Sequence, residues 1–109
     1  MREELEALLA RFNAKAASDP RLRAELEGIQ RTVVLDMKDG TKFHFTLKDA
    51  HVDGILDGGV ERPDLTIISD KDTVKGLLAG EIGPFKAYAT GRLKVKGDIE
   101  DLLRFRKFF

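Results

Sequence analysis

The 109-residue chain contains no cysteine. This excludes a disulfide scaffold, a zinc site with cysteine ligands and thiol catalysis. The chain also has no excess of either charge, because 19 Lys and Arg residues balance 19 Asp and Glu residues. We therefore do not expect nucleic acid as a partner, since binding it favours a basic excess. No apolar run is long enough to span a bilayer, and the start of the chain is too acidic for a targeting peptide, so we expect a cytoplasmic protein.

The composition is that of a folded, water-exposed domain. Hydrophobic residues make up 42% of the chain and charged residues 35%. This balance is typical of globular proteins, and a length near 100 residues suits one core. We therefore expect residues 1–109 to form a single domain.

The first part of the chain predicts two helices. Apolar residues recur at helical spacing between residues 3 and 17 and form one stripe, made of Leu5, Leu8, Leu9, Phe12 and Ala16. Asp19 can cap a second, shorter helix that begins at Pro20, where the missing N–H of proline costs nothing. Gly28 is the expected stop of that helix.

Two alternating stretches, residues 31–38 and 41–48, predict a β-hairpin around Asp39-Gly40. A two-residue loop would place Phe43 beside Asp36, on the polar side. A three-residue loop instead pairs Leu35 with Phe43 and keeps the apolar residues on one face, as a half-buried sheet requires. We therefore expect a type I turn with Gly40 left-handed in a bulge.

The second half of the chain predicts shorter elements. We expect a weak strand over residues 52–56, a strand over 64–69, and a helix that a Ser69-x-x-Asp72 capping box begins and Gly80 ends. A short helix opened by Pro84, a strand over 92–96 and a final helix capped by Asp98 follow. This order predicts an α+β domain, with helices over one face of a mostly antiparallel sheet.

The sequence does not carry an arrangement typical of an enzyme. His44 lies on the polar face of a predicted strand, which favours a solvated residue over a base or ligand. Neither His44 nor His51 belongs to a paired metal-binding motif, and neither serine lies in a Gly-x-Ser-x-Gly motif. The glycine-rich stretches match neither a phosphate loop nor a dinucleotide-binding motif. We expect no catalytic residue, no metal and no cofactor.

Apolar and basic residues are concentrated near the end of the sequence. The apolar ones are Phe85, Tyr88, Leu93, Val95, Leu102, Leu103, Phe105, Phe108 and Phe109, and six Lys and Arg residues follow Gly91. Spacing alone allows two interpretations. The apolar side chains are core beneath a solvated basic face, or they line an apolar cavity with a basic rim, suited to a lipid and an anionic membrane surface.

A motif in this region resembles a known family. Residues 84–98 read P-x-x-A-Y-x-x-G-R-L-x-V-x-G-D, which resembles the signature segment of the sterol carrier protein-2 (SCP-2) family of lipid-transfer domains. The stretch Pro63-Asp64-Leu65-Thr66-Ile67 and the helix end Leu77-Leu78-Ala79-Gly80 are similar to the preceding strand and helix of that family. The resemblance covers nearly the whole chain, from about Leu5.

The resemblance implies a five-stranded, mostly antiparallel sheet covered by helices, with an apolar tunnel between them. It implies binding of a fatty acid, acyl-CoA, phospholipid or sterol-like ligand, or service as an accessory domain of a larger protein. The expected ligand-binding residues are Phe85, Tyr88, Leu93, Val95, Leu102 and Phe105. We predict non-enzymatic lipid binding and transfer, with transient contact to an anionic membrane surface. The alternative is an interaction module with a filled core, whose C-terminal aromatic residues contact a partner protein or form a homodimer.

Overall fold

The computed structural model describes residues 2–97 and residue 100. In chain order the elements are α1 (Arg2–Ser18), α2 (Pro20–Glu25), β1 (Gln30–Asp36), β2 (Lys42–Lys48), β3 (His51–Val52), β4 (Leu56–Asp57), β5 (Leu65–Ser69), α3 (Lys71–Leu78), α4 (Pro84–Ala89) and β6 (Leu93–Gly97). The α+β class is confirmed. The predicted helix capped by Asp98 lies outside the described residues.

The two N-terminal helices form where the apolar spacing predicts them. In α1, Leu5, Leu9 and Phe12 are buried along one stripe. Asp19 caps α2 as predicted, because its Oδ1 accepts hydrogen bonds from the backbone N–H groups of Arg21 and Leu22, at 3.0 and 3.4 Å. None of the helices in residues 2–97 and 100 is long and apolar enough to cross a membrane.

The hairpin of β1 and β2 has the predicted register, with Leu35 opposite Phe43. Gly40 is left-handed, with a φ of 91°, as predicted. The type I turn is wrong, because Lys38 also has a positive φ, of 67°. The cause is a local hydrogen bond: the Lys38 N–H donates to the Asp36 carboxylate at 3.0 Å, which favours a different path for the loop.

The sheet has the strand order β3-β2-β1-β5-β6, and β4 pairs with β2 beside β3. The five strands of this path match the predicted number, and β4 is a sixth. The single predicted strand over residues 52–56 is instead the two short strands β3 and β4. The described pairings are antiparallel except that of β1 with β5, which is parallel.

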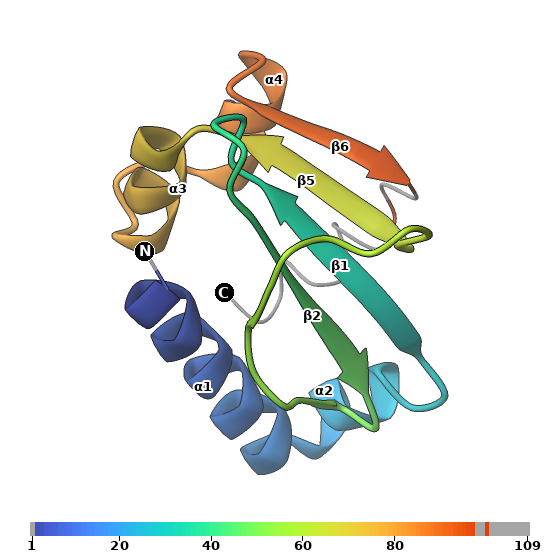
Figure 1. Ribbon diagram of the computed structural model, residues 1–109. Helices are drawn as coiled ribbons and strands as arrows, with labels where there is room; N and C mark the ends of the chain where they lie inside the picture. Colours follow the sequence, from blue (N-terminus) through green and yellow to red (C-terminus); the bar gives the residue numbers. More distant parts are fainter. Residues whose placement is uncertain (1, 98–99, 101–109) are drawn as a thin grey trace.

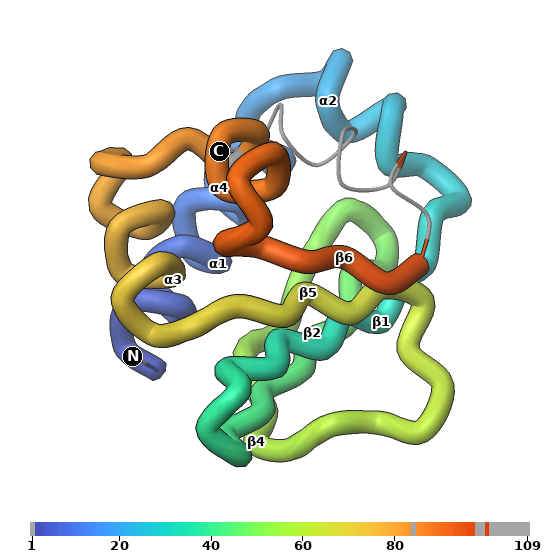
Figure 2. Tube along the Cα trace, turned by 90° about the horizontal axis from the view of Figure 1, so that it is seen from above, coloured from blue at the N-terminus to red at the C-terminus, as the bar shows by residue number. Residues whose placement is uncertain are grey.

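The helices and the connection from β4 to β5 lie on opposite faces of the sheet (Figures 1 and 2). The main core lies between α1 and the covered face. Val34 points to the other face, yet it is only 4% exposed. Gly59 lies close to it, since a Cβ built there would be 3.9 Å from the Val34 Cγ1. The connection therefore covers the one apolar residue that breaks the alternation of β1.

The predicted capping box at the start of α3 is wrong in its cap residue. The N-cap is Asp70, whose Oδ1 accepts the Thr73 N–H at 2.7 Å. Ser69 is instead the last residue of β5 and is fully buried, and its Oγ donates to the Arg92 carbonyl at 2.8 Å. This bond joins the end of β5 to the chain that enters β6.

Candidate functional site

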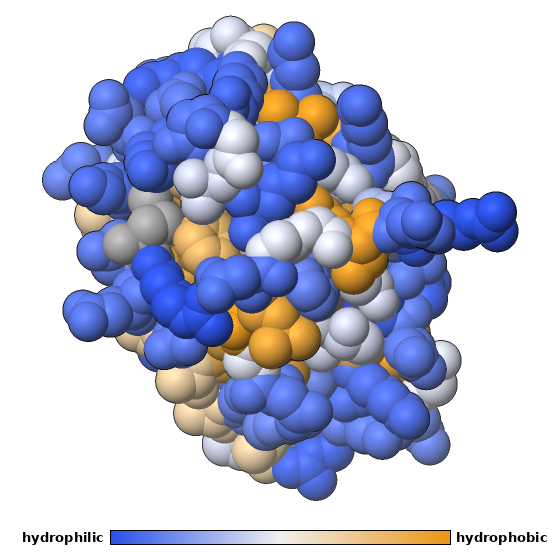
Figure 3. Space-filling view, viewed as in Figure 1, coloured by the Kyte–Doolittle hydropathy of each residue, from blue (hydrophilic) through white to orange (hydrophobic). Residues whose placement is uncertain are grey.

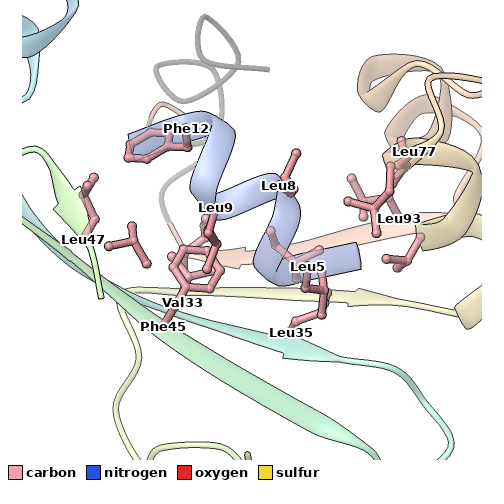
Figure 4. Close-up of a pocket in the computed structure, with 15 residues that line it drawn as sticks. Leu5, Leu8, Leu9, Phe12, Val33, Leu35, Phe45, Leu47, Leu77 and Leu93 are labelled. Carbon is pink, nitrogen blue, oxygen red and sulfur yellow. The ribbon is translucent and has the colours of Figure 1, made fainter. Parts of the chain in front are cut away.

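A cavity of about 210 Å³ lies between α1 and the covered face of the sheet (Figure 4). The helix contributes Leu5, Leu8, Leu9 and Phe12 to its wall. These residues belong to the stripe that predicted the helix, because positions three and four apart share one face. One side of the cavity is therefore a single helix laid across the sheet.

The sheet supplies the facing wall through alternate residues of adjacent strands. These are Val33 and Leu35 of β1, Phe45 and Leu47 of β2, Val52 of β3, and Leu65 and Ile67 of β5. Successive side chains of a strand point to opposite faces, so the strand alternation that predicted the hairpin also brings these residues to one surface.

One end of the cavity is formed by α3 and the start of β6. Val74, Leu77 and Leu78 come from α3, and Leu93 comes from β6. Figure 4 shows Leu77 and Leu93 at this end, and Phe12 and Leu47 at the other. The cavity therefore extends along α1.

Among the residues that the structure describes, every side chain that lines the cavity is aliphatic or aromatic and carries no polar group. A dry engineered cavity of about 150 Å³ is enough to bind benzene, whereas pockets for drug-sized ligands usually measure about 300–1,000 Å³. A volume of about 210 Å³ therefore suits part of a flexible hydrocarbon chain. The described lining provides an apolar surface, and its residues carry no group for acid–base or nucleophilic chemistry.

The predicted site residues are not gathered in one place. Leu93 is buried and lines the cavity. Phe85 and Tyr88 lie on α4 with 42% of their surface exposed, and Val95 is half-buried in β6. None of these three belongs to the described lining. Leu102 and Phe105 lie outside the described residues.

Sequence reasoning did not assign most of the lining to the site. The residues of α1, β1, β2 and α3 were recognised only as apolar faces. Their helical and strand periodicity is the signal that could have found them, but an apolar face has the same pattern over a solid core and over a hollow one.

A second, more open hollow of about 380 Å³ lies on the outside between α1 and α3; we call it the α1–α3 groove. It is lined by Glu4, Ala7, Arg11, Lys75, Leu78 and Ala79. Leu78 also lines the cavity, so the two hollows share a wall. Figure 3 shows apolar atoms at the surface near the middle of one face, with polar and charged side chains around them.

The perturbed carboxylates have structural roles. Hydrogen bonds from the Thr41 N–H and from Lys71 lower the pKa of Asp39 to about 2. The Thr73 N–H, which Asp70 caps, lowers the pKa of Asp70. His44 Nδ1 lies 2.9 Å from the Gly58 carbonyl oxygen, on the face away from the cavity. In residues 2–97 and 100, no three His, Asp or Glu side chains form a group that could hold a metal ion.

This fold and cavity define a class of protein: a small α+β domain with an apolar hollow between its sheet and the covering helices. The model of the SCP-2 sterol transfer family matches residues 5–109, and the chain belongs to this family. The family resemblance inferred from residues 84–98 is thereby confirmed, and with it a general relation to lipid transfer. A comparison with curated proteins found no match.

Solved structures share the fold at low sequence identity. The possible sterol carrier protein TT1886 from Thermus thermophilus is 21% identical with a TM-score of 0.66, and the match covers 99% of this chain and 80% of that one. Palmitated SCP2L2 from Aedes aegypti is 18% identical with a TM-score of 0.66, over 94% of this chain and 91% of that one. The inverting sec-alkylsulfatase Pisa1 from Pseudomonas sp. is 20% identical with a TM-score of 0.66, over 80% of this chain. The chain spans only 14% of that enzyme's length.

Proposed function

We propose that this protein binds a lipid in the apolar cavity and transfers it without any covalent step. The observation that carries the proposal is the lining itself, whose described residues all have aliphatic or aromatic side chains around about 210 Å³ of space. An apolar cavity that water does not fill gains free energy when a hydrocarbon enters it. A solid core would offer no such gain.

The free energy of transferring a lipid into the cavity suits both its uptake and its release. Burying about ten methylenes contributes roughly 8 kcal/mol, at about 0.8 kcal/mol each. That corresponds to about micromolar affinity from water before the cost of association. A ligand that comes from a bilayer leaves surroundings that are equally apolar, so exchange between membrane and protein is close to neutral.

A single acyl chain is the ligand that the cavity favours among the lipids considered. An acyl chain can bend to follow a narrow space along α1, whereas a rigid sterol ring system needs a wider one. The Aedes aegypti relative was solved in a palmitated form. The proposed ligands are therefore a fatty acid, or the acyl part of acyl-CoA or of a phospholipid.

Transient docking to an anionic membrane is the second part of the proposal. Arg92, Lys94 and Lys96 are exposed along β6 and the turn before it. The exposed Phe85 and Tyr88 lie on α4, which packs against β6. Basic residues near an anionic surface each contribute about 1 kcal/mol, and exposed aromatic rings suit the interface of a bilayer.

The test is uptake of a fluorescent fatty acid by a Leu93→Glu variant, because Leu93 is both a predicted site residue and part of the lining. We expect uptake to be lost, since an ionised carboxylate in the cavity is incompatible with hydrocarbon. Tyr88→Glu is the matched control and should retain uptake, because Tyr88 is exposed on α4. Unchanged uptake by folded Leu93→Glu protein argues against this cavity as the site.

The exposed aromatic pair also supports a second candidate, an interaction module in which α4 contacts a partner or a second copy. Sedimentation separates the two functions: a tight dimer that binds no lipid favours the module. Native mass spectrometry of protein purified without detergent complements it, because a co-purifying lipid identifies itself by mass.

A further inference from the structure

The α1–α3 groove lies beside the apolar cavity and differs from it in chemistry. The cavity lining has no charged side chain in the part of the chain that the structure describes, whereas the groove holds Arg11, Lys75 and Glu4. An amphiphile needs both kinds of surface, one for its hydrocarbon and one for its polar end. The two hollows meet at Leu78, which lines both.

The helices α1 and α3 contribute residues to both hollows. On α1, Leu8 faces the cavity while Ala7 and Arg11 face the groove. Leu78, the last residue of α3, belongs to both hollows. Lys75 of α3 and the C-cap residue Ala79 line the groove. Leu8 and Leu78 are only partly buried, unlike Leu5 and Leu9 deeper in the cavity. The apolar lining between the two hollows is therefore only partly buried at Leu8 and Leu78.

The two cations of the groove are available to a ligand. Arg11 and Lys75 are exposed, and neither side chain forms an ion pair or hydrogen bond within residues 2–97 and 100. Glu4 already has an interaction of its own. It stands two helical turns before Arg11 on α1, about 10 Å along the axis at 1.5 Å per residue. Among residues 2–97 and 100, the groove therefore offers two cations without an ion pair and one carboxylate that already has an interaction.

We propose that the α1–α3 groove is the mouth of the cavity, and that Arg11 and Lys75 bind the anionic head group of a single-chain amphiphile there. This inference rests on the proposed function, because it assigns the hydrocarbon chain to the apolar cavity. A carboxylate or a phosphate fits, since arginine and lysine donate charge-assisted hydrogen bonds to both. Ala7 and Ala79, which are small, leave room for the head group between the helices.

The test compares ligands that share a sixteen-carbon chain and differ at one end. Palmitate, hexadecyl phosphate and neutral hexadecanol are titrated against protein loaded with a neutral fluorescent dye, for the wild type and for the Arg11→Gln/Lys75→Gln variant. We expect the variant to lose about tenfold in affinity for at least one anionic ligand, the size expected for screened, exposed charge pairs. Affinity for hexadecanol should stay unchanged. The anionic ligand with the larger loss identifies the head group.

Arg21→Gln/Lys86→Gln is the matched control, because it removes the same two charges from exposed sites outside the groove. It should bind all three ligands like the wild type. The inference is overturned when Arg11→Gln/Lys75→Gln binds both anionic ligands as tightly as the wild type does, or when it loses hexadecanol equally. If the wild type binds none of the three ligands and no dye, the proposed function itself fails, which is a distinct result.

Discussion

Asn13 and Val52 are joined by two hydrogen bonds that fasten α1 to the edge of the sheet. The Asn13 Nδ2 donates to the Val52 carbonyl at 2.7 Å, and the Val52 N–H donates to Asn13 Oδ1 at 2.8 Å. The Asn13 amide thus satisfies the backbone N–H and C=O groups of Val52 that a further strand would otherwise bond. Because α1 forms one wall of the cavity, this pair fixes the position of that wall.

Replacing Asn13 should therefore loosen α1. We expect Asn13→Ala to lower the free energy of unfolding by about 2 kcal/mol, since two partly buried hydrogen bonds are lost at about 1 kcal/mol each. Asn13→Asp should also destabilise the protein, because a carboxylate cannot donate to the Val52 carbonyl. Urea denaturation measures both. Ser18→Ala is the control, because it removes only a longer, exposed hydrogen bond of 3.3 Å from α1, and it should leave the free energy of unfolding almost unchanged. An equal loss of stability in Ser18→Ala would contradict a specific role of the Asn13–Val52 pair.

Filling the cavity should block binding without unfolding the protein. Ile67→Trp places a larger apolar side chain into the space, so we expect palmitate affinity to fall by about tenfold or more while stability changes by less than about 1 kcal/mol. Ile68→Trp is the matched control, because the neighbouring residue of β5 points to the opposite face. Calorimetric titration measures binding. Equal binding by both variants would mean that the ligand does not occupy this cavity.

Gly97 should tolerate no side chain. Its φ is 115°, and a Cβ there would lie 2.4 Å from the Asp64 carbonyl oxygen. We expect Gly97→Ala to cost about 1–3 kcal/mol of stability. Two causes contribute to this cost: the positive φ and the close approach to the Asp64 oxygen. Gly58→Ala separates them, because Gly58 also has a positive φ, of 88°, but no atom within 4 Å of a Cβ built there. The thermal midpoint of Gly97→Ala should fall further; equal shifts would rule out the close approach to Asp64 as a cause.

Acid should remove the stabilisation provided by Asp39. The Thr41 N–H and Lys71, whose Nζ lies 3.0 Å from Asp39 Oδ2, lower the pKa of this carboxyl from 3.8 to about 2. A pKa lowered by folding stabilises the protein above the ordinary value, and this stabilisation is lost as the pH falls from about 4 towards about 2. Asp39→Asn should therefore be less stable than the wild type at neutral pH and nearly equal to it at pH 2. Glu61→Gln, which removes one negative charge at another exposed position, is the charge-matched control in the same denaturation series.

Regular alternation made much of the fold predictable from sequence. The pairing of Leu35 with Phe43 followed because a slip of one residue would have turned an apolar face to solvent. The loop between them was not predictable, because the Asp36 carboxylate competes for the Lys38 N–H and changes the turn. Ser69 was mistaken for a cap because its partner, the Arg92 carbonyl, is distant in sequence.

The site was less predictable than the fold, for a physical reason. Phe85 and Tyr88 are apolar and lie in the family motif, yet α4 places both at the surface. The motif instead covers the turn from α4 into β6. Ala87 is buried, and the Arg92 N–H donates a hydrogen bond to the Ala87 carbonyl at 2.9 Å. Leu93 is then the first residue of β6. The cavity wall is drawn mostly from ordinary strand and helix faces, which carry no distinguishing sequence.

The parallel pairing of β1 with β5 joins two segments that lie far apart in the sequence. The hairpin of β1 and β2 is local and can form within microseconds, whereas β5 must return from far along the chain before Leu65 can lie opposite Val33. Val33 and Leu65 both line the cavity. A chain in which only the β1–β2 hairpin has formed therefore has no complete cavity. Under the proposed function, a lipid therefore binds only the native state and, by mass action, protects that state against unfolding.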